Sequence, residues 1–288
     1  MKIAIGLLCM LYSTVLLSQL DHPKVSPAAT VTQEIGFTTI SIDYSRPAAR
    51  GRKIFGGLVP YGRIWRVGAN ESTKFSIDTE VSILGNQLAP GTYALYAFPE
   101  EGEWEIVFHK NTSHWGDGRK EYNPEEDAFR VRLQPQKQQS YQENFLISFD
   151  SISHNQATMV FHWANTSVCV PISVDTDSKM EEQIAIKVKT GPTAQTLYEA
   201  ARYYVEQDKK YPQALSYVNR AISLGGDTYY FHRVKSLAEA ALGEYQSAIE
   251  SAEKSLALAQ KEGKDEFVRL NQKHIDSCKV QLLRKNRK

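Results

Sequence analysis

The residues that offer the most chemistry lie in one short stretch that begins at Ser45 and ends at Arg66. This stretch carries six basic side chains and no acidic one. Guanidinium groups form forked hydrogen bonds with carboxylates, sulfates and phosphates, whereas like charges so close together repel one another unless negative groups compensate them. The stretch therefore predicts either a site for an acidic ligand or a cluster of ion pairs. Its basic residues are Arg46, Arg50, Arg52, Lys53, Arg63 and Arg66.

Two aromatic residues in the same stretch widen the range of ligands that it could bind. Tyr61 and Trp65 offer flat faces of the kind on which sugar rings and other planar groups stack. Because Asn70 and Glu71 follow closely and add polar groups, we expect a site for an anionic or glycan ligand. Its candidate residues are Arg46, Arg52, Trp65, Arg66, Asn70 and Glu71.

The same residues allow two other interpretations. In the structural one, arginines pair with Asp43, Glu71 or Asp127, and Phe55 and Trp65 anchor the stretch in the core. In the catalytic one, two of these three acids act on a glycan, because glycoside hydrolysis needs a carboxylate on each side of the bond that breaks. The sequence does not contain the distances that would separate these alternatives.

Other catalytic arrangements are missing from the sequence. It contains no Gly-x-Ser-x-Gly elbow, phosphate-binding loop, zinc-binding His-Glu pair or dinucleotide-binding glycine pattern. His109, His114 and Asp117 lie close together in the chain, but their spacing matches no closed zinc site. We therefore predict no metal and no cofactor, and we favour a binding protein over an enzyme.

The first half of the chain alternates apolar and polar residues with a period of two. Alternation of this kind, interrupted by turn residues, is typical of antiparallel strands with one buried face. We predict eight or nine strands that form an all-β antiparallel sandwich, or a partly open barrel, over residues 32–174. Clear examples lie at 40–44, 104–108, 129–133, 145–149 and 159–163.

In this arrangement the basic stretch becomes a long loop between a strand that ends at Tyr44 and one that begins near Thr73. Long ordered loops in compact domains are often functional. The strings Tyr-Ser-Arg-Pro at 44–47 and Trp-Arg-Val-Gly-Ala-Asn-Glu at 65–71 lie in or beside it. With Gly91-Thr-Tyr-Ala-Leu-Tyr further on, they make residues 32–174 resemble the domain of unknown function 2911 family. The resemblance implies an exported β domain, with a tetratricopeptide-like helical tail in many members, and it implies no catalytic residues.

After Thr176 the apolar spacing becomes helical. We predict a linker with a short helix at 175–192 and a helical domain at 193–288, so the whole chain is an α+β multidomain protein. Tyr211 and Tyr245 are 34 residues apart, and so are Ala214 and Ala248. A 34-residue period with alanine at helix crossings resembles the tetratricopeptide repeat, which implies a partner-binding surface for a protein or peptide.

The N-terminus predicts export. Lys2 precedes fifteen uncharged residues, Ile3–Leu17, which is the layout of a secretory signal peptide and is short for a membrane span of about 20 residues. We predict a signal peptide over 1–19, cleavage near Gln19 or Leu20, and no membrane span afterwards. Cys169 and Cys278 then remain, and we expect both to be free thiols.

Composition excludes several classes of protein. The 288 residues carry a net charge of +1, and 42% of them are hydrophobic, which argues against nucleic-acid binding and against disorder. The prediction is therefore an exported, non-enzymatic binding or interaction protein located in the periplasm, the cell envelope or the medium. The alternative is a cell-envelope hydrolase that acts on glycans with a carboxylate pair.

Overall fold

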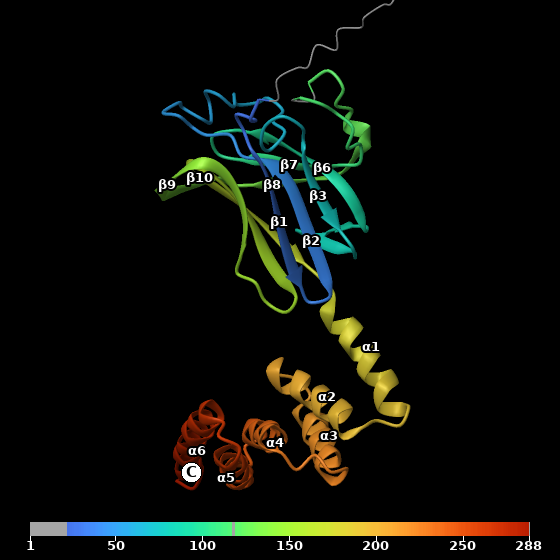
Figure 1. The fold of residues 1–288 in the computed structure, drawn as a ribbon, viewed down its shortest axis with the longest axis vertical. Coiled ribbons are helices and arrows are strands. Elements are labelled where there is room, and N and C mark those ends of the chain that lie inside the picture. Colours follow the sequence, from blue (N-terminus) through green and yellow to red (C-terminus); the bar gives the residue numbers. More distant parts are fainter. Residues whose placement is uncertain (1–21, 117–118, 288) are drawn as a thin grey trace, which may run out of the picture. The chain divides into compact units, whose positions relative to one another are not determined.

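The computed structural model describes residues 22–116 and 119–287. The chain divides into two compact units, and the boundary in the sequence lies between Thr176 and Asp177. The predicted signal peptide at 1–19 lies outside the described residues. Within them, no helix has both the length and the apolar character that crossing a membrane requires. The first unit contains two antiparallel sheets and the second contains helices (Figure 1).

The larger sheet has six strands, and each is antiparallel to its neighbours. Alternate residues of β2 are buried, as the period of two predicted, so one face of the sheet packs against a core. In spatial order the strands are β1 (Ala28–Ile35), β2 (Thr38–Ser45), β3 (Thr73–Ile77), β6 (Gly91–Pro99), β7 (Trp104–His109) and β8 (Asp127–Leu133).

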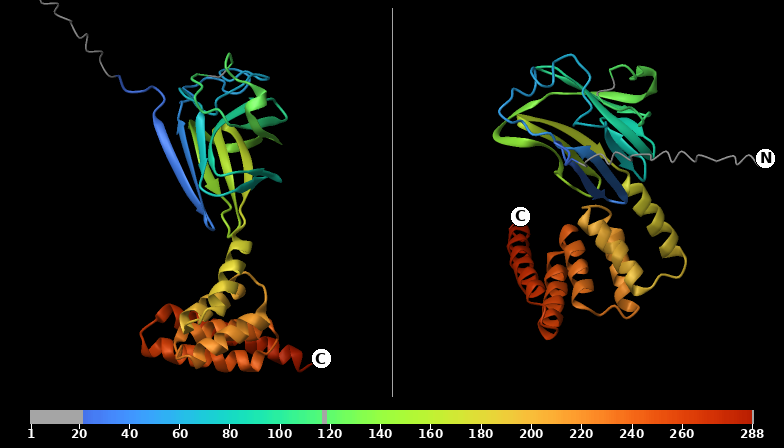
Figure 2. Two further views of the ribbon diagram at one scale, coloured as in Figure 1. Left: turned by 90° about the vertical axis from the view of Figure 1, so that its right-hand side faces the viewer. Right: turned by 45° about the horizontal axis from the view of Figure 1, so that its top comes forward.

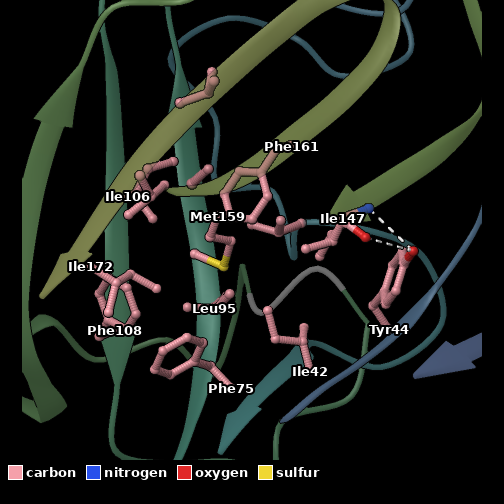
Figure 3. Close-up of a cluster of buried hydrophobic side chains, with 14 of the residues drawn as sticks. Ile42, Tyr44, Phe75, Leu95, Ile106, Phe108, Ile147, Met159, Phe161 and Ile172 are labelled. Atoms are coloured by element: carbon pink, nitrogen blue, oxygen red, sulfur yellow. Dashed lines mark hydrogen bonds between the residues drawn. The ribbon is translucent and has the colours of Figure 1, made fainter. Parts of the chain in front are cut away.

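The smaller sheet has four strands and stacks on the first, as the views in Figure 2 show. The buried side chains of both sheets form one hydrophobic cluster between them (Figure 3). In the described part of the chain the two sheets stay separate, so the first unit is a sandwich and no closed barrel forms. The strands of the smaller sheet are, in order, β5 (Asn86–Leu88), β4 (Val81–Ile83), β10 (Gln156–Ser173) and β9 (Gln136–Asp150).

One tyrosine joins the two sheets by hydrogen bonds within this core. The Tyr44 hydroxyl of β2 accepts from the backbone N–H of Ile147 in β9 at 3.1 Å and donates to its carbonyl at 3.4 Å. Figure 3 shows both bonds. A buried hydroxyl that satisfies a donor and an acceptor of the facing sheet holds the two layers in a defined position.

The second unit consists of six helices. Thr193 caps the second of them, because its side-chain oxygen accepts the N–H of Thr196 at 3.1 Å. Ala214 and Ala248, the alanines of the predicted repeat, are both fully buried. The tetratricopeptide likeness stays a prediction. The helices are α1 (Thr176–Lys189), α2 (Ala194–Glu206), α3 (Tyr211–Ser223), α4 (Tyr229–Ala241), α5 (Tyr245–Lys261) and α6 (Asp265–Lys285).

Candidate functional site

The basic loop runs from Arg46 to Ser72 and is fastened to both sheets. Its first part lies against β9, where the backbone N–H of Ala49 donates to the carbonyl of Glu143 at 2.8 Å. In its second part, Trp65 and Ala97 of β6 exchange two backbone hydrogen bonds of 2.8 Å each. The loop therefore continues the larger sheet beside β6, beyond the N-terminal start of β3 at Thr73, and its backbone is held at both ends.

Trp65 anchors the loop in the core. Its side chain is only 6% exposed, and its ring stacks on that of Trp163 with centroids 6.1 Å apart. The indole N–H donates to the carbonyl of Gly68 at 3.2 Å, and Phe55 meets the ring edge-on at 5.8 Å. Phe55 and Trp65 therefore hold the core positions of the structural interpretation, and Trp65 offers a ligand little free surface.

Five arginines line a cavity of about 290 Å³, and Trp65 also lines it. No acidic side chain occurs among its lining residues in the described part of the chain. The volume is close to the lower limit of about 300 Å³ for small-molecule sites, so the cavity suits a compact ligand. We call it the arginine pocket, and its arginines are Arg50, Arg52, Arg63, Arg66 and Arg119.

Backbone carbonyls orient two of these arginines. Arg52 donates from Nε to the carbonyl of Ala49 at 2.9 Å and from Nη2 to that of Ala48 at 2.6 Å. Arg66 donates from Nη1 to the carbonyl of Asn70 at 2.6 Å. A carbonyl is neutral, so these bonds fix the direction of a guanidinium group without cancelling its charge.

Most of the positive charge of the basic loop is not paired with a carboxylate. Among the described residues, five cations of the loop form no ion pair with a carboxylate within 4.0 Å: Arg46, Arg50, Arg52, Lys53 and Arg63. Glu143 approaches the loop, but its Oε1 accepts the backbone N–H of Arg50 at 2.8 Å. The structural interpretation therefore holds for the aromatic residues and does not extend to these five cations.

The structure brings together only some of the predicted site residues. Arg52, Trp65 and Arg66 line the arginine pocket. Arg46 does not, because its Nε donates to the carbonyl of Phe145 at 3.0 Å. The side-chain amide of Asn70 donates to the Ser26 carbonyl at 3.1 Å and to the Ser45 hydroxyl at 3.0 Å, and it thereby supports the loop from outside the pocket.

Glu71 lies at a second, smaller hollow of about 120 Å³, together with Asp43 and Lys74. Burial lowers the pKa of Lys74 below its ordinary value, and the nearby Glu71 carboxylate opposes that change. Asp127 does not line this hollow. It accepts hydrogen bonds from Tyr122 and Arg130 instead, so the structure brings only Asp43 and Glu71 of the three acids to one cavity.

Sequence reasoning missed part of the pocket. Arg50 and Arg63 are basic residues of the loop that the candidate set does not include, and no pattern in the sequence marks Arg119. Arg119 lies 53 residues beyond Arg66 in the chain. No spacing rule connects residues so far apart, and only the fold brings them to one cavity.

A family model described as "Protein of unknown function (DUF2911)" matches residues 26–172. The match covers half of the chain, which therefore belongs to the domain of unknown function 2911 family, as the motifs at 44–47 and 65–71 suggested. It includes both sheets and the basic loop, and the six helices follow it. Comparisons with curated proteins and with solved structures found no match.

Proposed function

We propose that this protein is exported and binds a compact anionic ligand in the arginine pocket without transforming it. The ligand carries a phosphate, sulfate or carboxylate group, either alone or as the acidic group of a glycan. The single observation that carries the proposal is the set of five arginines around one small cavity that no acidic side chain lines in the described part of the chain. Guanidinium groups pair with such oxyanions through two parallel hydrogen bonds.

Binding is favoured over catalysis by what surrounds the pocket. A hydrolase would need an acid and a base beside the bound group, and the pocket offers neither among its described lining residues. The carboxylates at the hollow of Glu71 belong to a different cavity. Export rests on the apolar run of Ile3–Leu17, and binding of a protein or peptide by the helical unit stays a prediction from the repeat.

Calorimetric titration of the chain without residues 1–19 tests the binding function. Inorganic phosphate, sulfate and glucuronate are the probes, and glucose is the uncharged comparison. We expect Arg50→Ala and Arg63→Ala each to weaken binding of the best anion by about tenfold to a hundredfold, since a hydrogen bond to a charged group contributes about 1.5–3 kcal/mol.

Lys53→Ala is the matched control. Lys53 belongs to the same loop and carries the same charge, but it does not line the pocket. We expect this variant to retain affinity within about threefold, because exposed charges at a distance are screened by salt. Equal losses of affinity in Arg50→Ala, Arg63→Ala and Lys53→Ala would show a general charge effect and no site. If no anion gives a heat of binding at millimolar concentration, the proposed function is excluded.

A further inference from the structure

Two histidines and a glutamate meet on the outer face of the larger sheet, away from the core between the sheets. His109 ends β7, His114 lies in the following loop, and Glu126 ends the short 3-10 helix η1 (Pro124–Glu126). One ligand atom from each of the three lies within 4.8 Å of the others. Both histidines are buried, at 0% and 9% exposure, which is unusual for side chains in and beside a surface loop.

The surroundings of His109 hold its ring in one orientation. Its Nδ1 lies 2.9 Å from Oδ1 of Asp127. A carboxylate in this position favours the tautomer that carries hydrogen on Nδ1, and the lone pair is then on Nε2. Metal-binding histidines in proteins are oriented in the same manner, by a carboxylate or carbonyl on the far nitrogen.

The other nitrogen of His109, Nε2, is fully buried and makes no hydrogen bond within the described structure. It lies 3.4 Å from Oε2 of Glu126, so in the tautomer with hydrogen on Nδ1 two lone pairs face each other at a short distance. A buried acceptor without a partner costs free energy, and a cation between the two atoms would remove that cost.

The separation of His109 and Glu126 fits one small metal ion. With metal–ligand bonds of about 2.0–2.1 Å, two ligands of a tetrahedral Zn²⁺ ion lie about 3.3 Å apart. The distance of 3.4 Å between His109 and Glu126 matches this value. A ring nitrogen of His114 lies within 4.8 Å of the ligand atoms of His109 and Glu126, so the second imidazole is close enough to turn toward the same ion.

Neighbouring residues support the three side chains from outside. Asp127 accepts from the Tyr122 hydroxyl at 2.8 Å and from Arg130 Nε at 2.7 Å, so its carboxylate is held in place for His109. The side-chain amide of Asn111 approaches both carboxylate oxygens of Glu126, at 3.3 and 3.4 Å. The cluster is thus built by the fold around it, in contrast to a chance group of exposed side chains.

We propose that His109, His114 and Glu126 bind one divalent transition-metal ion of the zinc class, and that Asp127 is a positioning residue for His109. Two imidazoles and a carboxylate form a donor set that suits Zn²⁺ and leaves a fourth position for water or a ligand atom. This site is separate from the arginine pocket in its residues, and it does not depend on the proposed function.

Metal titration of the chelator-treated chain without residues 1–19 tests this proposal. We expect one equivalent of Zn²⁺ per chain in competition with a chromogenic chelator, and with Co²⁺ we expect the intense visible absorption of a tetrahedral ion. Asp127→Asn should weaken binding by about 10- to 100-fold, the usual effect of losing an outer partner of a ligand. His114→Ala and Glu126→Gln should weaken it more and should change the Co²⁺ spectrum.

His232→Ala is the matched control, because His232 also faces a carboxylate, Asp227, at 2.6 Å, but lies in the helical unit. It should bind Zn²⁺ as the parent chain does. Circular dichroism of each variant separates loss of a ligand from loss of folding, and Glu126→Gln keeps the size of the side chain. Absence of stoichiometric Zn²⁺ binding at micromolar protein, or binding that survives both His114→Ala and Glu126→Gln in folded protein, would overturn the proposal.

Discussion

Replacing Arg63 by alanine separates a ligand site from a structural ion-pair cluster. In the structural interpretation the loop's arginines are paired, and removing one partner of a buried pair costs about 3–5 kcal/mol. Arg63 is exposed and has neither a hydrogen bond nor an ion pair among the described residues. We therefore expect Arg63→Ala to change the free energy of unfolding by less than about 0.5 kcal/mol without ligand, as surface substitutions usually do.

The same variant should lose the stabilisation that an anion provides. A ligand at 100 times its Kd stabilises the folded state by about 2.7 kcal/mol. For a unit of about 150 residues this raises Tm by roughly 5–10 °C, since each kcal/mol corresponds to about 2–4 °C. We expect this rise for the parent chain in the best anion found by calorimetry, and for Arg63→Ala we expect at most a third of it.

Tryptophan fluorescence is the suitable assay, because all four tryptophans lie in the β unit and the signal does not report on the helices. The anion is compared with NaCl at equal ionic strength, so that simple screening cancels. Trp65→Ala serves as the structural comparison and should lose about 3–5 kcal/mol, because it removes a buried aromatic side chain. A loss of 3 kcal/mol or more in ligand-free Arg63→Ala would refute the reasoning.

Three further predictions concern other parts of the chain. Tyr44→Phe should lower the free energy of unfolding by about 1–3 kcal/mol in urea denaturation, because it leaves the buried N–H of Ile147 without its acceptor; an unchanged midpoint would contradict this. Burial raises the pKa of Glu239 above its ordinary value of 4.5, so the folded state binds this proton more tightly than the unfolded state does. The free energy of unfolding therefore decreases as pH rises above 4.5, because the buried carboxyl group must then carry a charge. Glu239→Gln should therefore stabilise the helical unit at pH 8 and lose this advantage near pH 4. Circular dichroism melts at the two pH values measure the difference, and a difference that does not depend on pH would contradict burial of the charge as its cause. N-terminal sequencing of the exported protein should find Gln19 or Leu20 as the first residue, whereas an intact Met1 would refute the predicted cleavage.

Local patterns in the sequence were enough to predict the elements. Ile40, Ile42 and Tyr44 are buried on one face of β2 because a period of two matches the pleat of a strand. The helical domain expected from residue 193 opens with α2 at Ala194, since Thr193 supplies a local capping signal. The connecting helix was expected within a linker at 175–192, and α1 fills most of that range.

Contacts between distant parts of the chain were beyond the reach of such patterns. The pairing of Trp65 with Ala97 depends on where β3 begins in space, and no local signal encodes this. The spacing of His109 and His114 in the chain carries no information about the burial of either side chain. Glu126 joins the two histidines only because η1 brings it back beside the end of β7.

The arginine pocket combines fixed and adaptable cations, and this division has consequences for selectivity. Arg52 and Arg66 are oriented by carbonyls before any ligand arrives, so binding costs little further side-chain entropy at these positions. Arg50 and Arg63 carry exposed side chains without partners among the described residues, and immobilising such a side chain costs about 0.5–1.5 kcal/mol. The fixed pair should therefore set which oxyanion geometry fits, while the adaptable pair sets how large an attached group is tolerated. We expect Arg52→Lys to change the order of the affinities for phosphate, sulfate and carboxylate, and Arg63→Lys to leave that order intact.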